Sequence, residues 1–246
     1  MKKHRWQIML ALVLIGLSAG LYFLHYILFH DMHHIMIYLV GDIAFVPVEV
    51  LFVTLIIHQL LAIREKRSLF EKLNMIIGTF FSEVGTRLLA YCSESDRKAG
   101  EIRQHIPAKD SWTRKEFRAA ALYLKGRTYT VDINKIDLEM LRIFLIERRD
   151  FLLRLLENPN LLEHDSFTDL LWAVFHLSEE LAYRDDLRTL PQSDYQHLAG
   201  DITRAYHSLA IEWVSYMNHL KENYPYLFSL ALRTNPFDQS ASVIVR

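Results

Sequence analysis

Asp42, Pro47 and Glu49 are the residues of this chain whose types and spacing most clearly point to chemistry, because they lie within a long apolar segment. An ionisable side chain in a hydrocarbon environment costs about 2.5–3.5 kcal/mol on insertion scales, so it needs a partner or a function. Glu49 follows Asp42 by two helical turns, roughly 700° of rotation, which places both carboxylates on one helix face. Pro47 removes one backbone hydrogen bond and can leave a carbonyl oxygen free beside them. This acidic face predicts either a proton or cation site or a buried pairing that fixes helix packing.

Gly16 and Gly20 form a Gly-x-x-x-Gly pair in the preceding apolar segment. Such spacing strips one helix face of side chains and lets another backbone approach closely. Two partners remain open: the second apolar segment of the same chain, or another copy of the chain. Matching depths across a short loop brings Glu49 to the level of these glycines, so Glu49 pairs with Ser18 or with its counterpart in a neighbouring copy. Conduction would require an oligomer, since two helices cannot enclose a pore.

Between the two apolar segments lie several potential metal ligands: His30, Asp31, His33 and His34. Imidazole and carboxylate groups are ligands of zinc, copper and nickel. The loop is too short to wrap an ion unaided and contains no cysteine. We therefore expect solvated histidines here, with metal binding as the less favoured alternative.

The remainder of the chain offers two histidine–carboxylate spacings, His176-x-x-Glu179 and His197-x-x-x-Asp201. Di-iron bundles use Glu-x-x-His on paired helices, and that order is absent from the sequence. We expect each pair to be an ordinary helix-surface pair. A glycine-rich phosphate loop, a nucleophile elbow and a dinucleotide fingerprint are also missing. The sequence thus predicts no catalytic residue, metal or other cofactor, and a protein that is not an enzyme.

The elements that carry these residues begin with two apolar stretches, 6–29 and 35–63, each long enough to cross a hydrocarbon core of about 30 Å. Lys and Arg flank both stretches, whereas the loop 30–34 has neither, which predicts an inner-membrane hairpin of a prokaryotic cell with both termini in the cytoplasm. Basic residues after the second stretch are expected to lie at the membrane surface: Arg64, Lys66, Arg67 and Lys72.

The rest of the chain shows the 3.6-residue apolar period of helices. We expect a stalk helix over 64–92, a helical domain over 93–234 and a loose tail over 235–246. Helix starts are predicted by side-chain oxygens followed by an acid or amide three residues later, or by a single capping acid. These starts are Thr113, Asp137, Ser166 and Ser193; the second helix is expected to reach Glu157. The fold class is all-α: a two-helix transmembrane hairpin followed by a cytoplasmic helical bundle.

Two segments, 41–50 (GDIAFVPVEV) and 223–230 (NYPYLFSL), resemble those of an uncharacterised group of prokaryotic two-span membrane proteins. The resemblance implies this architecture and adds no activity or site residue.

Composition narrows the partners of the protein. The formal net charge of -1 argues against nucleic-acid binding, which requires a basic face. The single cysteine excludes an internal disulfide. We expect an integral membrane anchor, scaffold or signalling module that contacts the lipid bilayer, forms a homo-oligomer and offers a surface to a cytoplasmic protein partner. The alternative is an oligomeric ion channel or proton-coupled transport subunit that uses Asp42 and Glu49.

Overall fold

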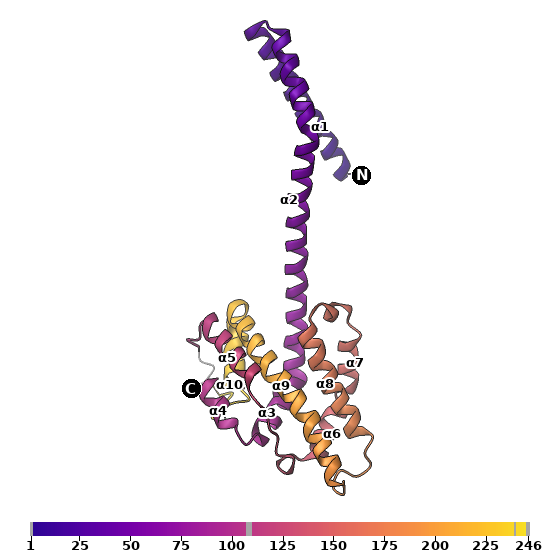
Figure 1. Ribbon diagram of the computed structural model, residues 1–246, viewed down its shortest axis with the longest axis vertical. Helices are drawn as coiled ribbons and strands as arrows, with labels where there is room; N and C mark the ends of the chain where they lie inside the picture. Colours follow the sequence, from indigo (N-terminus) through magenta and orange to yellow (C-terminus); the bar gives the residue numbers. More distant parts are fainter. Residues whose placement is uncertain (1, 107–109, 239, 245–246) are drawn as a thin grey trace. The chain divides into compact units, whose positions relative to one another are not determined.

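The computed structural model describes residues 2–106, 110–238 and 240–244, without the side chains of 2–5 and 162–163 (Figure 1). It divides into two compact units, Met1–Lys66 and Arg67–Arg246. The division falls close to the expected end of the hairpin at residue 63. Lys2, Lys3 and Arg5, which contribute to the predicted topology, have side chains outside the described set.

Two long helices run through the N-terminal unit, and the second continues into the C-terminal unit. Helix α1 spans Lys2–Phe29 and α2 spans Met32–Phe80, the latter continuing through Pro47. The segments Trp6–Phe29 and Met32–Ser95 each contain an 18-residue window apolar enough to cross a membrane by length and composition, with mean hydropathies of 2.1 and 2.2. Their most apolar windows are not buried by the described chain. This distinguishes them from the core helices of a globular domain.

A π-helical turn follows α2 without a break in the helix. This turn, η1, spans Phe81–Gly85 and leads into α3, Thr86–Ser95. The rings of Phe80 and Phe81 pack tightly over Gly85: a Cβ at Gly85 would lie 2.7 Å from Phe81 and 2.8 Å from Phe80. The stalk expected over 64–92 is therefore helical throughout. It includes one π-helical turn, η1, at the point where the two aromatic rings pack over Gly85.

The rest of the C-terminal unit is helical apart from one isolated bridge between Asp96 and Val131 among the described residues. Helix α9 is central, because it packs against α3, α5, α8 and α10 (Figure 1). Leu198, Ile202 and Leu209 lie on its fully buried face at helical spacing. The remaining elements are α4 (Ala99–His105), α5 (Arg114–Gly126), η2 (Ile133–Lys135), α6 (Leu138–Ile146), α7 (Arg149–Leu156), η3 (Pro159–Glu163), α8 (Asp165–Ala182), α9 (Gln192–Asn223) and α10 (Pro225–Arg233).

Two of the four predicted helix starts are confirmed. Thr113 forms a complete capping box with Glu116 at the start of α5. The Asp137 carboxylate accepts a hydrogen bond of 3.0 Å from the backbone amide of Met140 at the start of α6. Both caps are local features, so spacing alone could identify them.

The other two helices begin within one residue of the predicted Ser166 and Ser193, at Asp165 and Gln192, but the predicted caps are wrong. Helix α8 is capped by His164, whose Nδ1 accepts a hydrogen bond of 3.2 Å from Phe167. The Ser166 hydroxyl donates instead to Glu212 on α9, at 2.6 Å. Helix α9 begins at Gln192 directly after Pro191, with no side-chain cap from Ser193. A tertiary partner and a proline thus decide these two boundaries.

Arg148 interrupts the helix that was expected to run from Asp137 to Glu157. Helices α6 and α7 meet at Glu147 and Arg148, where the Arg148 guanidinium donates to the carbonyl oxygen of Phe144 at 3.3 Å. Its Nε donates to the carbonyl oxygen of Glu83 in η1 at 2.9 Å. The break therefore has a tertiary cause.

We expected a loose C-terminal tail from residue 235, but the first residues of this tail are packed against the domain. Phe237 is 2% exposed, and its ring meets the ring of Trp213 edge-on at 5.3 Å. Ser93 donates a hydrogen bond of 2.9 Å to the carbonyl oxygen of Pro236. Burial of one aromatic side chain is enough to fix this segment.

A buried ion pair joins Asp96, directly after α3, to Arg127, directly after α5. Their side chains are 0% and 5% exposed, and Arg127 Nη1 donates to Asp96 Oδ2 at 2.8 Å. The same carboxylate accepts from the Tyr206 hydroxyl at 3.3 Å and from the Lys98 amide at 2.8 Å. The carboxylate is thus satisfied by three donors, as a buried charge requires.

Candidate metal centre

Helices α8 and α9 form an antiparallel hairpin closed by the short segment between Ala182 and Gln192. Arg184 fixes this connection through two hydrogen bonds of 2.7 Å to the Asp194 carboxylate. The Tyr195 hydroxyl adds a third, donating to the carbonyl oxygen of Leu187 at 2.9 Å. Such bidentate pairing is geometrically specific, so it fixes the register between the two helices near the loop.

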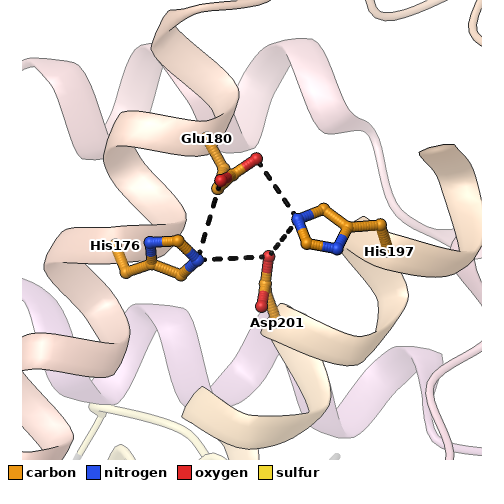
Figure 2. A group of neighbouring side chains, drawn as sticks. All are labelled: His176, Glu180, His197 and Asp201. Carbon is orange, nitrogen blue, oxygen red and sulfur yellow. Dashed lines mark ion pairs between the residues drawn. The ribbon is translucent and has the colours of Figure 1, made fainter.

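Four side chains converge across this hairpin, two from each helix (Figure 2). His176 and Glu180 lie one turn apart on α8, and His197 and Asp201 lie one turn apart on α9. Because the helices are antiparallel, His176 faces Asp201 and Glu180 faces His197. We call this group the four-residue cluster. Its donor atoms all lie within 4.8 Å of one another.

The distances within the four-residue cluster fit a shared ion better than direct hydrogen bonds. His197 Nε2 lies 3.3 Å from Asp201 Oδ2 and 3.4 Å from Glu180 Oε2. His176 Nε2 lies 3.6 Å from Asp201 Oδ2 and 3.7 Å from Glu180 Oε1. These exceed the usual N–H···O range of about 2.7–3.2 Å. A tetrahedral ion with bonds of about 2.0–2.2 Å would separate its ligands by roughly 3.3–3.6 Å, close to these four distances, although the donor atoms as a group lie up to 4.8 Å apart and would have to draw together around the ion.

Asp201 provides a second, independent indication of a ligand. Its side chain is 2% exposed, and Oδ1 accepts a hydrogen bond of 2.9 Å from Arg204. The other oxygen, Oδ2, is buried without a hydrogen-bond partner among the described residues and points towards both imidazoles (Figure 2). An unsatisfied buried acceptor costs about 1–3 kcal/mol. A cation between the histidines would offset that cost.

The charge of Glu180 and the exposure of the two histidines suit a cation site. A hydrogen bond from Arg184 lowers the pKa of Glu180, so this carboxylate stays ionised near neutral pH. His176 and His197 are about half exposed, at 46% and 51%, so an ion has access from solvent. The donor set of two imidazoles and two carboxylates fits zinc or a neighbouring transition metal.

Sequence reasoning named three of these four residues but did not bring them together. It paired His176 with Glu179, whereas Glu179 points elsewhere and pairs with Arg149 at 2.9 Å. The residue one full turn from His176 is Glu180. Two matched i, i+4 pairs, His176-x-x-x-Glu180 and His197-x-x-x-Asp201, on either side of a short loop were the signal that could have found the cluster.

The loop residues His30, Asp31, His33 and His34 do not form a comparable group among the described residues. Asp31 accepts a hydrogen bond of 3.1 Å from the backbone amide of His34, as a helix cap does. The rings of His25 and His34 meet edge-on at 5.7 Å. Asp31 therefore has a structural role at the start of α2.

The candidate residues of the apolar helices differ in their partners. Asp42 Oδ2 accepts a hydrogen bond of 3.0 Å from the Tyr22 hydroxyl of α1. Glu49 makes no hydrogen bond or ion pair with another described residue, including Ser18. Around Gly16 and Gly20 nothing in the described chain lies within 4 Å of where a Cβ would be. Their bare face is thus not packed against the hairpin itself.

The four basic residues expected at a membrane surface are exposed in the structure. Arg67 pairs with Glu71 at 3.3 Å, and both side chains remain largely open to solvent. They are Arg64, Lys66, Arg67 and Lys72.

Comparison with known proteins covers nearly the entire chain. The profile of the N-terminal helical domain of MJ1433 matches residues 2–61, and that of its C-terminal helical domain matches residues 69–233. A relative from Methanocaldococcus jannaschii, named "Uncharacterized protein MJ1433", is 47% identical over 244 residues, which is 99% of this chain and 98% of the relative. No solved structure matches the chain. These matches agree with the architecture of two long apolar helices and a helical domain, and the chain belongs to the MJ1433 family.

Proposed function

We propose that this protein is a membrane-anchored scaffold or signalling module whose C-terminal domain binds one divalent transition-metal ion. The metal site is the four-residue cluster, and the observation that carries it is the buried Oδ2 of Asp201, which has no hydrogen-bond partner among the described residues and faces both imidazoles. Two imidazoles favour zinc, copper, nickel or iron over magnesium and calcium. Among these metals, zinc prefers a tetrahedral arrangement, and the four separations between imidazole nitrogens and carboxylate oxygens, 3.3–3.7 Å, are near those of such a site.

A bound ion would join the two helices at a point that side-chain packing does not cover. It would stabilise the folded domain by mass action, by about 2.7 kcal/mol at a free concentration one hundred times its dissociation constant. The stability of the α8–α9 hairpin would therefore rise with the fraction of the protein that has metal bound. This is the property expected of a module that responds to metal availability.

Zinc titration of the full-length protein in lipid nanodiscs, after removal of metal with a chelator, tests the site. Calorimetry should show a single high-affinity ion per chain. His197→Ala and Asp201→Asn should abolish this binding. Glu179→Gln is the matched control for Glu180→Gln: only the latter should weaken binding, because Glu179 lies outside the cluster.

A double variant, His33→Ala with His34→Ala, separates the cluster from the histidines of the loop. It should bind zinc like the parent. Binding that survives both His197→Ala and Asp201→Asn, or that disappears with the loop histidines, would show that the four-residue cluster is only an ion-pair network.

The membrane anchor is proposed from the two apolar helices, whose apolar windows the rest of the described chain does not bury. Soluble monomers rarely expose an apolar patch larger than roughly 300–600 Å². The distribution of Lys and Arg supports an inner-membrane hairpin with both termini in the cytoplasm. A phosphatase reporter that is active only outside the cytoplasm should stay inactive when fused after Arg246. Activity of that fusion would refute the topology.

Assembly into a homo-oligomer is proposed from Gly16, Gly20 and Glu49. The open glycine face and a carboxylate without a partner among the described residues both favour contact with another copy. Gly16→Ile should reduce crosslinking in membranes, whereas Ala11→Ile, roughly 140° away on the same helix, should not. Glu49→Gln should preserve assembly and Glu49→Leu should weaken it. A parent protein that stays monomeric at all protein-to-lipid ratios would rule the oligomer out.

An oligomeric ion channel or proton-coupled transport subunit is the alternative, and Glu49 is the residue that supports it. The Tyr22–Asp42 hydrogen bond favours packing over conduction for the other carboxylate. Cation or proton flux into liposomes by the parent, lost in Glu49→Gln while the oligomer persists, would replace the scaffold proposal with the transport one.

A further inference from the structure

Two arginines hold the carboxylates of the four-residue cluster from behind. Arg184 Nη1 donates to Glu180 Oε2 at 2.8 Å, and Arg204 Nη1 donates to Asp201 Oδ1 at 2.9 Å. In each carboxylate one oxygen is thereby engaged by a guanidinium. The other oxygen, Glu180 Oε1 or Asp201 Oδ2, has no arginine partner and lies 3.7 Å or 3.6 Å from His176 Nε2, whereas the 3.4 Å contact of His197 is with the arginine-bound Glu180 Oε2.

Arg184 is the more firmly held of the two. Its side chain is 15% exposed and is fixed by the bidentate pairing with Asp194 on α9. It also donates to the carbonyl oxygen of Glu180, so both ends of that residue are tied to the same guanidinium. Arg204 is mostly exposed and makes a single contact to Asp201 within α9.

We propose that Arg184 and Arg204 set the coordination number of the metal site, by limiting Glu180 and Asp201 to one ligand oxygen each. This inference rests on the proposed metal-binding function. With two monodentate carboxylates and two imidazoles, the protein supplies four donors, the number that zinc takes in a tetrahedral site.

The same arrangement disfavours the hard cations. Calcium takes six to eight oxygen ligands and commonly uses carboxylates in bidentate fashion, and this site offers only two oxygens. Arg184 also pairs with Asp194, so the two guanidinium groups offset only part of the local carboxylate charge; what they withhold from a hard cation is the second oxygen of each ligand carboxylate. Imidazole nitrogen then decides the affinity, which favours zinc and its transition-metal neighbours.

Cobalt provides a direct readout, because four-coordinate Co²⁺ absorbs visible light far more strongly than six-coordinate Co²⁺. The experiment uses the full-length protein in nanodiscs, stripped of metal and loaded with Co²⁺ alone. The parent should show the intense four-coordinate spectrum. Arg204→Gln frees Asp201 Oδ1 and should shift the spectrum towards the weak, higher-coordinate form.

Competition between Zn²⁺ and Mn²⁺ measures the selectivity of the same samples. Arg204→Gln should narrow the preference for zinc by about tenfold, within the range known for residues behind metal ligands. The smaller preference for zinc should result mainly from tighter binding of Mn²⁺ by the variant. Arg188→Gln is the matched control for charge, since Arg188 is an exposed arginine of the same hairpin loop that does not contact the cluster.

Arg184→Gln should act in the same direction, and Arg204→Lys should restore the spectrum and selectivity of the parent by keeping a donor beside Oδ1. Circular dichroism establishes that each variant is folded. A higher-coordinate cobalt spectrum in the parent, or unchanged spectra and selectivity in both glutamine variants, would overturn this inference while leaving metal binding intact. Failure of the parent to bind Zn²⁺ or Co²⁺, or binding that survives His197→Ala, would instead refute the proposed function.

Discussion

Replacing Arg127 with methionine removes the cationic half of the ion pair buried between α3 and α5. Methionine keeps much of the length and apolar contact of the arginine stem. It leaves Asp96, which is fully buried, with the Tyr206 hydroxyl and the Lys98 amide as its remaining donors. The variant also loses the hydrogen bond of 2.9 Å from Arg127 to the carbonyl oxygen of Lys98.

Breaking a buried pair from one side costs about 3–5 kcal/mol, because the other charge stays buried without compensation. Two donors still serve Asp96, so the lower end, about 3 kcal/mol, is expected. For a domain of this size 1 kcal/mol corresponds to about 2–4 °C in melting temperature, which gives a fall of roughly 6–12 °C. The neighbouring pair between Arg97 and Asp132 provides the control. Arg97 is 68% exposed, and Arg97→Met should cost at most about 1 kcal/mol.

Urea and thermal unfolding of the full-length protein in mild detergent, followed by tryptophan fluorescence, measures both variants; Trp213 is buried and reports on the core. The double variant Asp96→Asn with Arg127→Met should recover part of the loss, since no buried charge remains. Equal, small losses in Arg127→Met and Arg97→Met would refute the reasoning, because burial would then make no difference to the cost of breaking the pair.

Three further outcomes are expected. Gly85→Ala should lower the free energy of unfolding by about 1–3 kcal/mol, because the new methyl group would overpack against the rings of Phe80 and Phe81. Gly200→Ala should raise it by roughly 0.5–1 kcal/mol, because its Cβ meets open space within α9. Chemical denaturation of the two variants measures both changes. Cys92 is 1% exposed and burial raises the pKa of its thiol to about 12, so mass spectrometry should find it unalkylated by iodoacetamide until the protein unfolds. A hydrogen bond from Arg184 lowers the pKa of Asp194 below its usual 3.8, so the stability contributed by this pair is present above pH 3.8 and is lost as the pH falls through the lower folded-state pKa. Melting curves should therefore show a smaller acid-induced loss of stability in Arg184→Gln than in the parent. The same pH dependence in both proteins would contradict this.

Features that depend on neighbours in sequence could be predicted. The apolar runs of α1 and α2, the unbroken continuation of α2 and the caps at Thr113 and Asp137 all depend on residues within a short stretch of the chain. The boundaries at Ser166 and Ser193 could not, because a partner on another helix and a preceding proline decide them. The same reason explains the break at Arg148. Its guanidinium donates hydrogen bonds to the carbonyl oxygens of Glu83 and Phe144, and the contact with Glu83 comes from a distant part of the chain.

The metal site lay partly within reach of the sequence. His176, His197 and Asp201 were noticed for their spacing, but judging them required the antiparallel register of α8 and α9. That register depends on the Arg184–Asp194 pair and on the apolar faces of the two helices, which are contacts between elements. The burial of Asp201 is likewise a property of the packed hairpin, since its spacing alone is that of an exposed surface residue.

Arg148 also has a consequence for how the domain opens. Its guanidinium bridges the π-helical turn η1, through Glu83, and the last turn of α6, through Phe144. Neither irregular turn can straighten into regular α-helix without drawing its carbonyl oxygen away from the shared donor. The two turns, far apart in the chain, should therefore unfold and refold as one cooperative unit, with amide protons on both sides of the bridge exchanging at matched rates.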